Sequence, residues 1–162
     1  MRNDIDHAVV DVNDVADYFI YKSQFDARRR SSISPLKLQK LLYYSQAWFY
    51  TLMERKLFSD KIEAWVHGPV VPSIYDKYKR YGYNDISKNV DNIPQSIKRN
   101  EDVKDILDAV WYTYNQFDAK TLEKISHMES PWRKARGDLK AYQPSNREIT
   151  VEDMRNYYKT YI

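Results

Sequence analysis

The spacing of apolar residues along the chain predicts a protein built mainly from amphipathic helices. From Val12 onward, apolar side chains recur with the i, i+3, i+4 spacing of one helix face, and Asn13 is a candidate N-cap. A stronger pattern opens at Ser34-Pro35, a capping serine followed by a proline that suits the first helical position. Through Leu52, nearly the whole circumference of this second helix is apolar or aromatic. Such a helix is normally central, with neighbours packed on several sides.

One stretch shows the two-residue alternation of a β-strand. Residues Lys61 to Val66 alternate in polarity, and His67-Gly68-Pro69 follows as a turn whose proline should end the strand. Another helix is predicted to begin at Pro72 and to end at Gly82. Residues 83–99 carry isolated apolar positions among polar ones, which predicts a long loop, with a short extended pair as the alternative.

Polar residues that suit helix starts mark the last third of the chain: Asn100, Asp118, Ser130 and Thr150. The helix after Asp118 carries Leu122, Ile125 and Met128 on one face. These patterns predict a single, mainly α domain of about six or seven helices with a small β element near residues 61–66. We expect residues 1–11 to be a flexible lead-in and residues 12–162 to form the domain.

Composition narrows the class of protein. The chain has no cysteine, which excludes disulfides, thiol catalysis and Cys-based zinc sites and suits a reducing cytoplasm. No apolar run is long enough for a membrane span or a signal peptide, so we expect a cytoplasmic protein without membrane contact. The 15 tyrosines either serve an interface or fill the boundary of a small core.

Motifs for catalysis are missing from the sequence. The three histidines, His7, His67 and His127, lie far apart without metal-ligand spacing, and no glycine-rich phosphate loop or nucleophile elbow occurs. We therefore expect no enzyme activity, no metal and no cofactor. His67 has two interpretations, since its imidazole could contact a partner or could hydrogen-bond a backbone carbonyl and fix the turn; we favour the second.

Two basic runs raise the alternative of a DNA-binding transcriptional regulator. They are Arg28-Arg29-Arg30 and Arg133-Lys134-Ala135-Arg136, in a chain whose net charge is only +3. A DNA-binding protein normally concentrates several phosphate contacts on one element, and no helix-turn-helix spacing is visible. Each run is more simply a solvated loop or helix end, and we do not expect nucleic acid to be a partner.

Two blocks of sequence resemble the Panacea (SocA-like) antitoxin family. The first is Ser34-Pro35-Leu36-Lys37-Leu38-Gln39-Lys40-Leu41-Leu42-Tyr43-Tyr44-Ser45-Gln46-Ala47-Trp48, which is similar to the opening helix signature of that family. The second is Ile62-Glu63-Ala64-Trp65-Val66-His67-Gly68-Pro69-Val70-Val71-Pro72, followed by Tyr75, which resembles its Ala-Trp-x-x-Gly-Pro-Val region. The resemblance extends from Val12 to about Tyr81.

The resemblance implies a helical antitoxin of a bacterial or phage toxin–antitoxin pair. Such a protein neutralises a protein toxin encoded by an adjacent gene through direct binding, and one branch of the family delivers its toxin to the ClpXP protease. Within the blocks, Leu38, Leu41, Leu42, Trp48 and Val66 are expected in the core. We predict that the binding surface uses residues exposed beside that core, namely Tyr43, Trp65, His67, Tyr75 and Tyr78, since tyrosine and tryptophan are favoured interface anchors.

Overall fold

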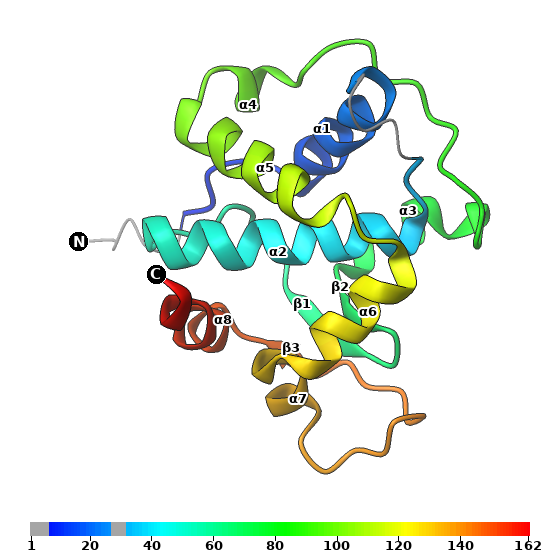
Figure 1. Cartoon of the computed structure of the whole chain (residues 1–162), viewed down its shortest axis with the longest axis vertical. Coiled ribbons are helices and arrows are strands. Elements are labelled where there is room, and N and C mark those ends of the chain that lie inside the picture. The colour runs from blue at the N-terminus through cyan, green and yellow to red at the C-terminus, as the bar shows by residue number, and fades with distance from the viewer. Residues whose placement is uncertain (1–6, 27–31) are drawn as a thin grey trace.

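Helix α2 (Pro35–Met53) is the element around which the rest of the chain is arranged in the computed structural model, which describes residues 7–26 and 32–162. The Ser34 hydroxyl accepts a hydrogen bond from the Lys37 backbone N–H at 3.2 Å, and Pro35 lies in the first turn. Of the 19 residues in α2, 14 are buried. The prediction of a central helix is confirmed, and Figure 1 shows α2 crossing the middle of the molecule.

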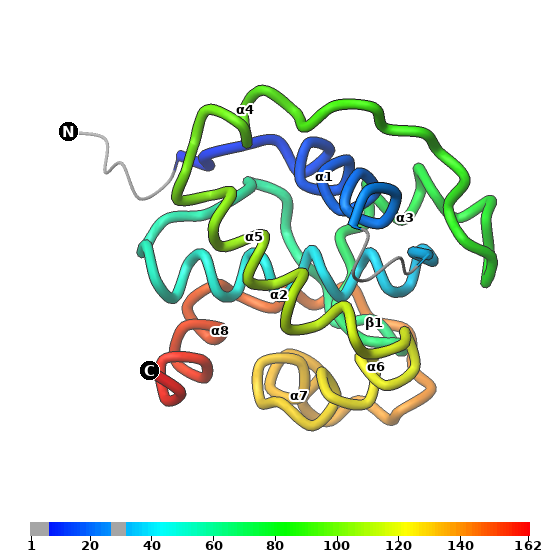
Figure 2. The backbone as a smooth tube through the Cα atoms, turned by 45° about the horizontal axis from the view of Figure 1, so that its top comes forward, coloured from blue at the N-terminus to red at the C-terminus, as the bar shows by residue number. Residues whose placement is uncertain are grey.

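Two groups of helices enclose α2 from opposite sides, as Figures 1 and 2 show. On one side lie α1 (Val12–Phe25), α4 (Gln95–Lys98) and α5 (Glu101–Tyr114). On the other lie α6 (Ala119–Met128), α7 (Ser130–Arg136) and α8 (Val151–Tyr158). Helix α3 (Pro72–Tyr78) continues into the short 3₁₀ helix η2 (Lys79–Tyr81), and η3 (Lys159–Tyr161) follows α8. The mainly α class is confirmed.

The β element is a small antiparallel sheet in the order β2-β1-β3. Its strands are β1 (Ile62–Trp65), β2 (Gly68–Val70) and β3 (Glu148–Ile149). The predicted strand therefore ends one residue early, because Val66 and His67 form the hairpin turn. The expectation that Pro69 ends strand pairing was also wrong. Pro69 lies opposite Ala64 in β2, an edge strand, where a residue without an N–H is tolerated.

The predicted helix starts are confirmed at Asn100, Asp118 and Thr150, whose side chains each accept a hydrogen bond from a backbone N–H three residues on. Two others were wrong. Asp11, not Asn13, caps α1, because its carboxylate accepts from the Asn13 N–H at 2.7 Å. Ser130 is the first residue of α7 and makes no capping bond, since Glu129 occupies the cap position.

Residues 83–99 contain the four-residue helix α4 and no extended pair. Ile97 of α4 is fully buried, and the backbone N–H of Ile86 donates to the Ile33 carbonyl at 2.8 Å, so this segment is fastened to the core. With α4 included, the described residues form eight α-helices rather than six or seven. None of the helices in the described segments has the length and hydropathy needed to span a membrane.

Burial departs from the predicted helix faces at their ends. Leu52 is 49% exposed and Met128 is 74% exposed, because each lies at the end of its helix, beyond the elements that pack against it. Trp48 and Val66, both expected in the core, are only half-buried. Six tyrosines are buried among the described residues, and they supply much of the aromatic core: Tyr18, Tyr43, Tyr44, Tyr50, Tyr78 and Tyr158.

Candidate functional site

A groove of about 850 Å³ lies beside the β1–β2 hairpin. It lies between the first turn of α2, the hairpin, the α3–η2 segment and the loop that precedes β3. Its apolar lining consists of Pro35, Leu36, Trp65, Val66, Val70, Tyr75, Tyr83 and Pro144. Polar groups stand among them, including Gln39, Glu63, His67, Lys79, Lys120 and Asn146. An apolar groove with a few fixed polar groups is the usual form of a binding site.

Three of the five predicted binding residues meet in this groove. The rings of Trp65 and Tyr75 lie edge to face with their centroids 4.8 Å apart. The indole N–H of Trp65 donates to Glu63 at 2.9 Å, which holds the ring in place while Tyr75 remains 39% exposed. Two aromatic side chains held in one orientation lose little entropy on binding, which suits them as interface anchors.

The prediction that Tyr43 and Tyr78 are exposed was wrong. Tyr43 is 1% exposed because α8 packs over it, and its hydroxyl lies 3.0 Å from that of Tyr158. Tyr78 is 3% exposed, and its hydroxyl accepts a hydrogen bond from Lys88. Both residues face inward and do not reach the groove.

His67 joins the hairpin turn to helix α6. Its Nδ1 lies 2.8 Å from Oε1 of Glu123, so its partner is a carboxylate and not the backbone carbonyl we favoured. Burial by itself would raise the pKa of Glu123, but the hydrogen bond with His67 and the charges of His67 and Lys120 outweigh that effect and lower it. The imidazole stays 65% exposed at the groove, so one side chain both fixes the turn and lines the groove.

The hairpin rests on a buried lysine. Lys40 of α2 is fully buried, with its Nζ 3.4 Å from the Pro69 carbonyl. Burial lowers the pKa of Lys40 to about 7, against an opposing contribution from Glu123. Gly68 has φ +109°, and a Cβ there would lie 2.7 Å from Cε of Lys40, so glycine is required both for its conformation and for the close approach.

Sequence reasoning missed the groove residues that arrive from other parts of the chain, such as Leu36, Tyr83, Lys120 and Asn146. Leu36 had a local signal, because it stands next to the capped proline on the first turn of α2. The others come from segments with no pattern that points to one location. No group of three His, Asp or Glu side chains within residues 7–26 and 32–162 is placed to hold a metal ion.

Of the two basic runs, only the second lies within the residues that the structure describes. Arg28-Arg29-Arg30 lies outside the described residues. In the second run Arg136 is 3% exposed, so the expectation of a solvated helix end was wrong for it, and Lys134 pairs with Asp153 at 2.8 Å. Buried in this way, Arg136 cannot contact a phosphate backbone.

Comparisons with known proteins agree with the two sequence blocks that line the groove. The family model described as antitoxin SocA-like, Panacea domain matches residues 38–133. Antitoxin SocA of Caulobacter vibrioides (strain NA1000 / CB15N) is 32% identical over 110 residues, which is 62% of this chain and 58% of that relative. The match thus spans less than two thirds of the relative's length, and no solved structure matches significantly. With more than half of its residues inside the family match, the chain belongs to the SocA-like, Panacea domain antitoxin family.

Proposed function

We propose that this chain is an antitoxin that neutralises a cognate protein toxin by binding it directly at the groove beside the β1–β2 hairpin. Family membership supports the antitoxin role, since both the family and the relative from Caulobacter are named for it. We expect a gene next to that of the chain to encode the toxin.

The observation that carries the site is the convergence of the two family-like blocks on one groove. Pro35, Leu36 and Gln39 come from the first block, and the hairpin residues with Tyr75 come from the second. Most side chains of these blocks are buried, so a shared need for core packing explains much of each pattern. Several of their less buried members, however, meet at one surface that has apolar walls and rigid aromatic side chains.

Growth of a bacterial host provides the test. We expect expression of the neighbouring open reading frame alone to arrest growth, and co-expression of this chain to restore it. The Trp65→Ala and Tyr75→Ala variants should weaken the complex about tenfold or more, as is usual for aromatic anchors at interfaces. Tyr112→Ala removes a tyrosine that is 59% exposed on α5, outside the groove, and should rescue growth like the wild type. A harmless neighbour, or arrest that persists with both proteins present, would contradict the proposal.

The same assay separates direct occlusion from delivery to a protease. If the chain only covers the toxin, rescue will be equal in hosts with and without ClpXP, and the toxin level will stay constant. If the chain acts as an adaptor, the toxin will disappear only where ClpXP is present. Immunoblotting of the toxin over time after the two genes are induced distinguishes these outcomes.

A further inference from the structure

Glu129, the residue between α6 and α7, is a carboxylate surrounded by tyrosines. Its Oε1 accepts hydrogen bonds from the hydroxyls of Tyr44 at 2.6 Å and Tyr158 at 3.0 Å. Tyr43 extends the network, because its hydroxyl lies 3.0 Å from that of Tyr158. Helices α2 and α8 therefore hold this carboxylate in one position with neutral hydroxyl groups.

No basic side chain among the described residues forms an ion pair with Glu129. Two other partly buried carboxylates of this chain do have such partners: Glu123 has His67 and Lys120, and Asp108 has Lys22 and Lys104. Burial raises the pKa of Glu129, and its two tyrosine hydrogen bonds only partly oppose that effect. The site thus holds a negative charge that the described part of the protein leaves without a counter-charge.

The two tyrosines use only one of the two carboxylate oxygens of Glu129. Oε2 accepts no hydrogen bond from a described residue. Two polar side-chain atoms of the described segments are fully buried without a hydrogen-bond partner, His127 Nε2 and Arg155 Nε. Oε2 of Glu129 also has no partner but is not one of them, so it keeps some contact with solvent. Oε2 is therefore the acceptor that a donor from another molecule would use.

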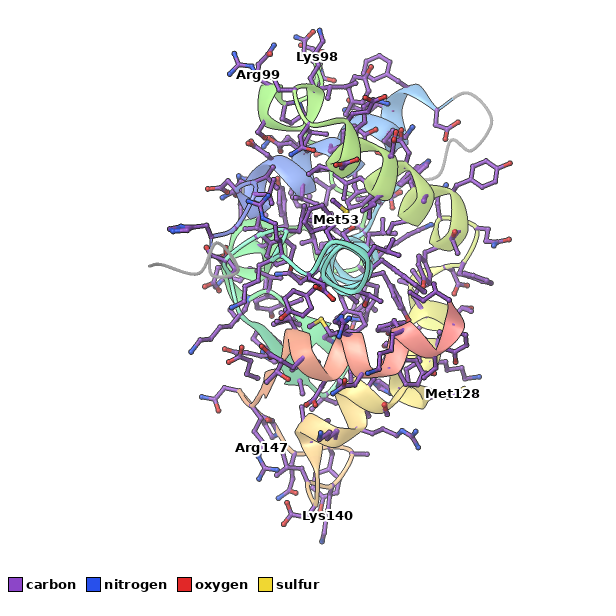
Figure 3. The ribbon with its side chains drawn as sticks, turned by 90° about the vertical axis from the view of Figure 1, so that its left-hand side faces the viewer. Met53, Lys98, Arg99, Met128, Lys140 and Arg147 are labelled. Atoms are coloured by element: carbon purple, nitrogen blue, oxygen red, sulfur yellow. The ribbon has the colours of Figure 1, made fainter. Side chains whose placement is uncertain are left out.

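Exposed apolar side chains are connected to Glu129 through the chain and through its tyrosine partners. Met128, next to Glu129 in the chain, is 74% exposed, and Tyr161 is 64% exposed. The Tyr161 ring lies 5.6 Å from that of Tyr157, which in turn lies 4.9 Å from the ring of Tyr158, the hydrogen-bond donor to Glu129. Figure 3 shows Met128 at the edge of the molecule on the side of the C-terminal helices. We call Met128, Glu129, Tyr157 and Tyr161 the tyrosine face.

We propose that the tyrosine face is a second docking site, which receives an arginine side chain of a protein partner. A guanidinium group donates paired hydrogen bonds to a carboxylate and stacks on tyrosine rings, so it supplies both the missing positive charge and an apolar contact. That the partner is the toxin rests on the proposed function. The groove includes Lys120, at the start of the ten-residue helix α6, and Glu129 follows its end, so the two sites lie about 15 Å apart along α6.

The test compares affinities for the co-purified toxin by titration calorimetry. Glu129→Gln removes the charge but keeps an amide oxygen that accepts from Tyr44 and Tyr158, so the fold should persist. We expect it to weaken binding about 10- to 100-fold and to reduce the salt dependence of the affinity. The matched control is Glu152→Gln, which removes the same charge from an exposed position in the first turn of α8. Wild-type affinity in the Glu129→Gln variant would overturn the proposal while leaving the antitoxin role intact.

A second measurement needs no toxin and therefore separates this site from the proposed function. In a methionine-methyl NMR spectrum, N-acetyl-arginine methylamide should shift the Met128 signal saturably, whereas the citrulline analogue, which has no charge, should not. Met53, at the end of α2 and 38% exposed, serves as an internal reference. An equal Met128 shift in the Glu129→Gln variant, or none in the wild type, would overturn the site even if the chain neutralises a toxin through its groove.

Discussion

At the scale of single residues, Lys40 is the least expected feature, since a lysine is fully buried with one long hydrogen bond to a carbonyl. A buried ammonium group loses its hydration, and the charge of Glu123 compensates for only part of that loss. The folded state therefore binds a proton at Lys40 more weakly than the unfolded chain does. Between about pH 7 and the ordinary lysine pKa of 10.5, the unfolded state carries more protons, so rising pH stabilises the fold across that window.

We predict that Lys40→Met raises the free energy of unfolding at pH 7 by about 1–3 kcal/mol, because an apolar chain of similar volume replaces a poorly compensated charge. The variant should also lose most of the wild-type gain in stability between pH 7 and 10. Urea denaturation at several pH values measures both effects. Lys61→Met, at a side chain that is 76% exposed, should change neither. Destabilisation with an unchanged pH slope would indicate that the ammonium is well compensated where it lies.

At the scale of elements, Arg136 organises the loop between α7 and β3. Its guanidinium donates to the carbonyls of Ala64 at 3.0 Å, Lys140 at 2.8 Å and Gln143 at 2.7 Å. It also lies over the Trp132 ring, 5.2 Å from the centroid. Because this loop continues to Ser145 and Asn146 in the groove wall, one buried side chain links strand β1, helix α7 and the candidate binding surface.

We predict that Arg136→Lys lowers the free energy of unfolding by about 2–4 kcal/mol, because one ammonium group cannot replace the fork of guanidinium donors. Hydrogen exchange at residues 138–147 should become faster than in the wild type, and toxin binding at the groove should weaken. Arg133→Lys, at an exposed position of the same helix, is the control and should leave exchange in the loop unchanged. Wild-type exchange in the Arg136→Lys variant would show that the loop is held by other contacts.

How well a feature could be predicted from the sequence depends on how far apart along the chain the interacting residues lie. The caps at Ser34, Asn100, Asp118 and Thr150 were predictable because each hydrogen bond spans three residues of chain. The two-residue strand β3 had no local signal, since it depends on pairing with Ile62, far away in the sequence.

In the candidate site too, local features were predictable from the sequence and contacts between distant segments were not. Tyr43 and Tyr75 are both tyrosines on amphipathic helices, yet α8 covers the first and leaves the second at the groove. The partner of His67 is 56 residues distant. Local pattern therefore identified Trp65, His67 and Tyr75 as candidates, but only the packing of distant segments separates them from Tyr43 and Tyr78.

At the scale of the whole molecule, the fold extends beyond the family match. Helices α1 and α8 lie outside residues 38–133, and both pack against α2. Together they bury Val12, Val15, Ala16, Tyr18, Phe19, Ile20, Val151, Met154 and Tyr158. At roughly 1.5–3 kcal/mol for each large apolar side chain, this burial is at least comparable with the about 5–15 kcal/mol of net stability that a domain has. These segments are therefore part of one core, in keeping with our proposal that residues 12–162 form the domain.

We predict that a fragment of residues 38–133 does not fold, although it contains the whole family match. It would lack the Ser34 cap, strand β3 and both covering helices, and it would expose Tyr43 and Tyr44 on the face of α2 that α8 covers. Circular dichroism during heating and the dispersion of amide NMR signals should show no cooperative transition and no fixed tertiary packing. A chain of residues 7–158, which keeps every helix from α1 to α8, should melt cooperatively near the temperature of the full chain. A cooperative transition in the shorter fragment would mean that α1 and α8 are additions to a core that is stable without them.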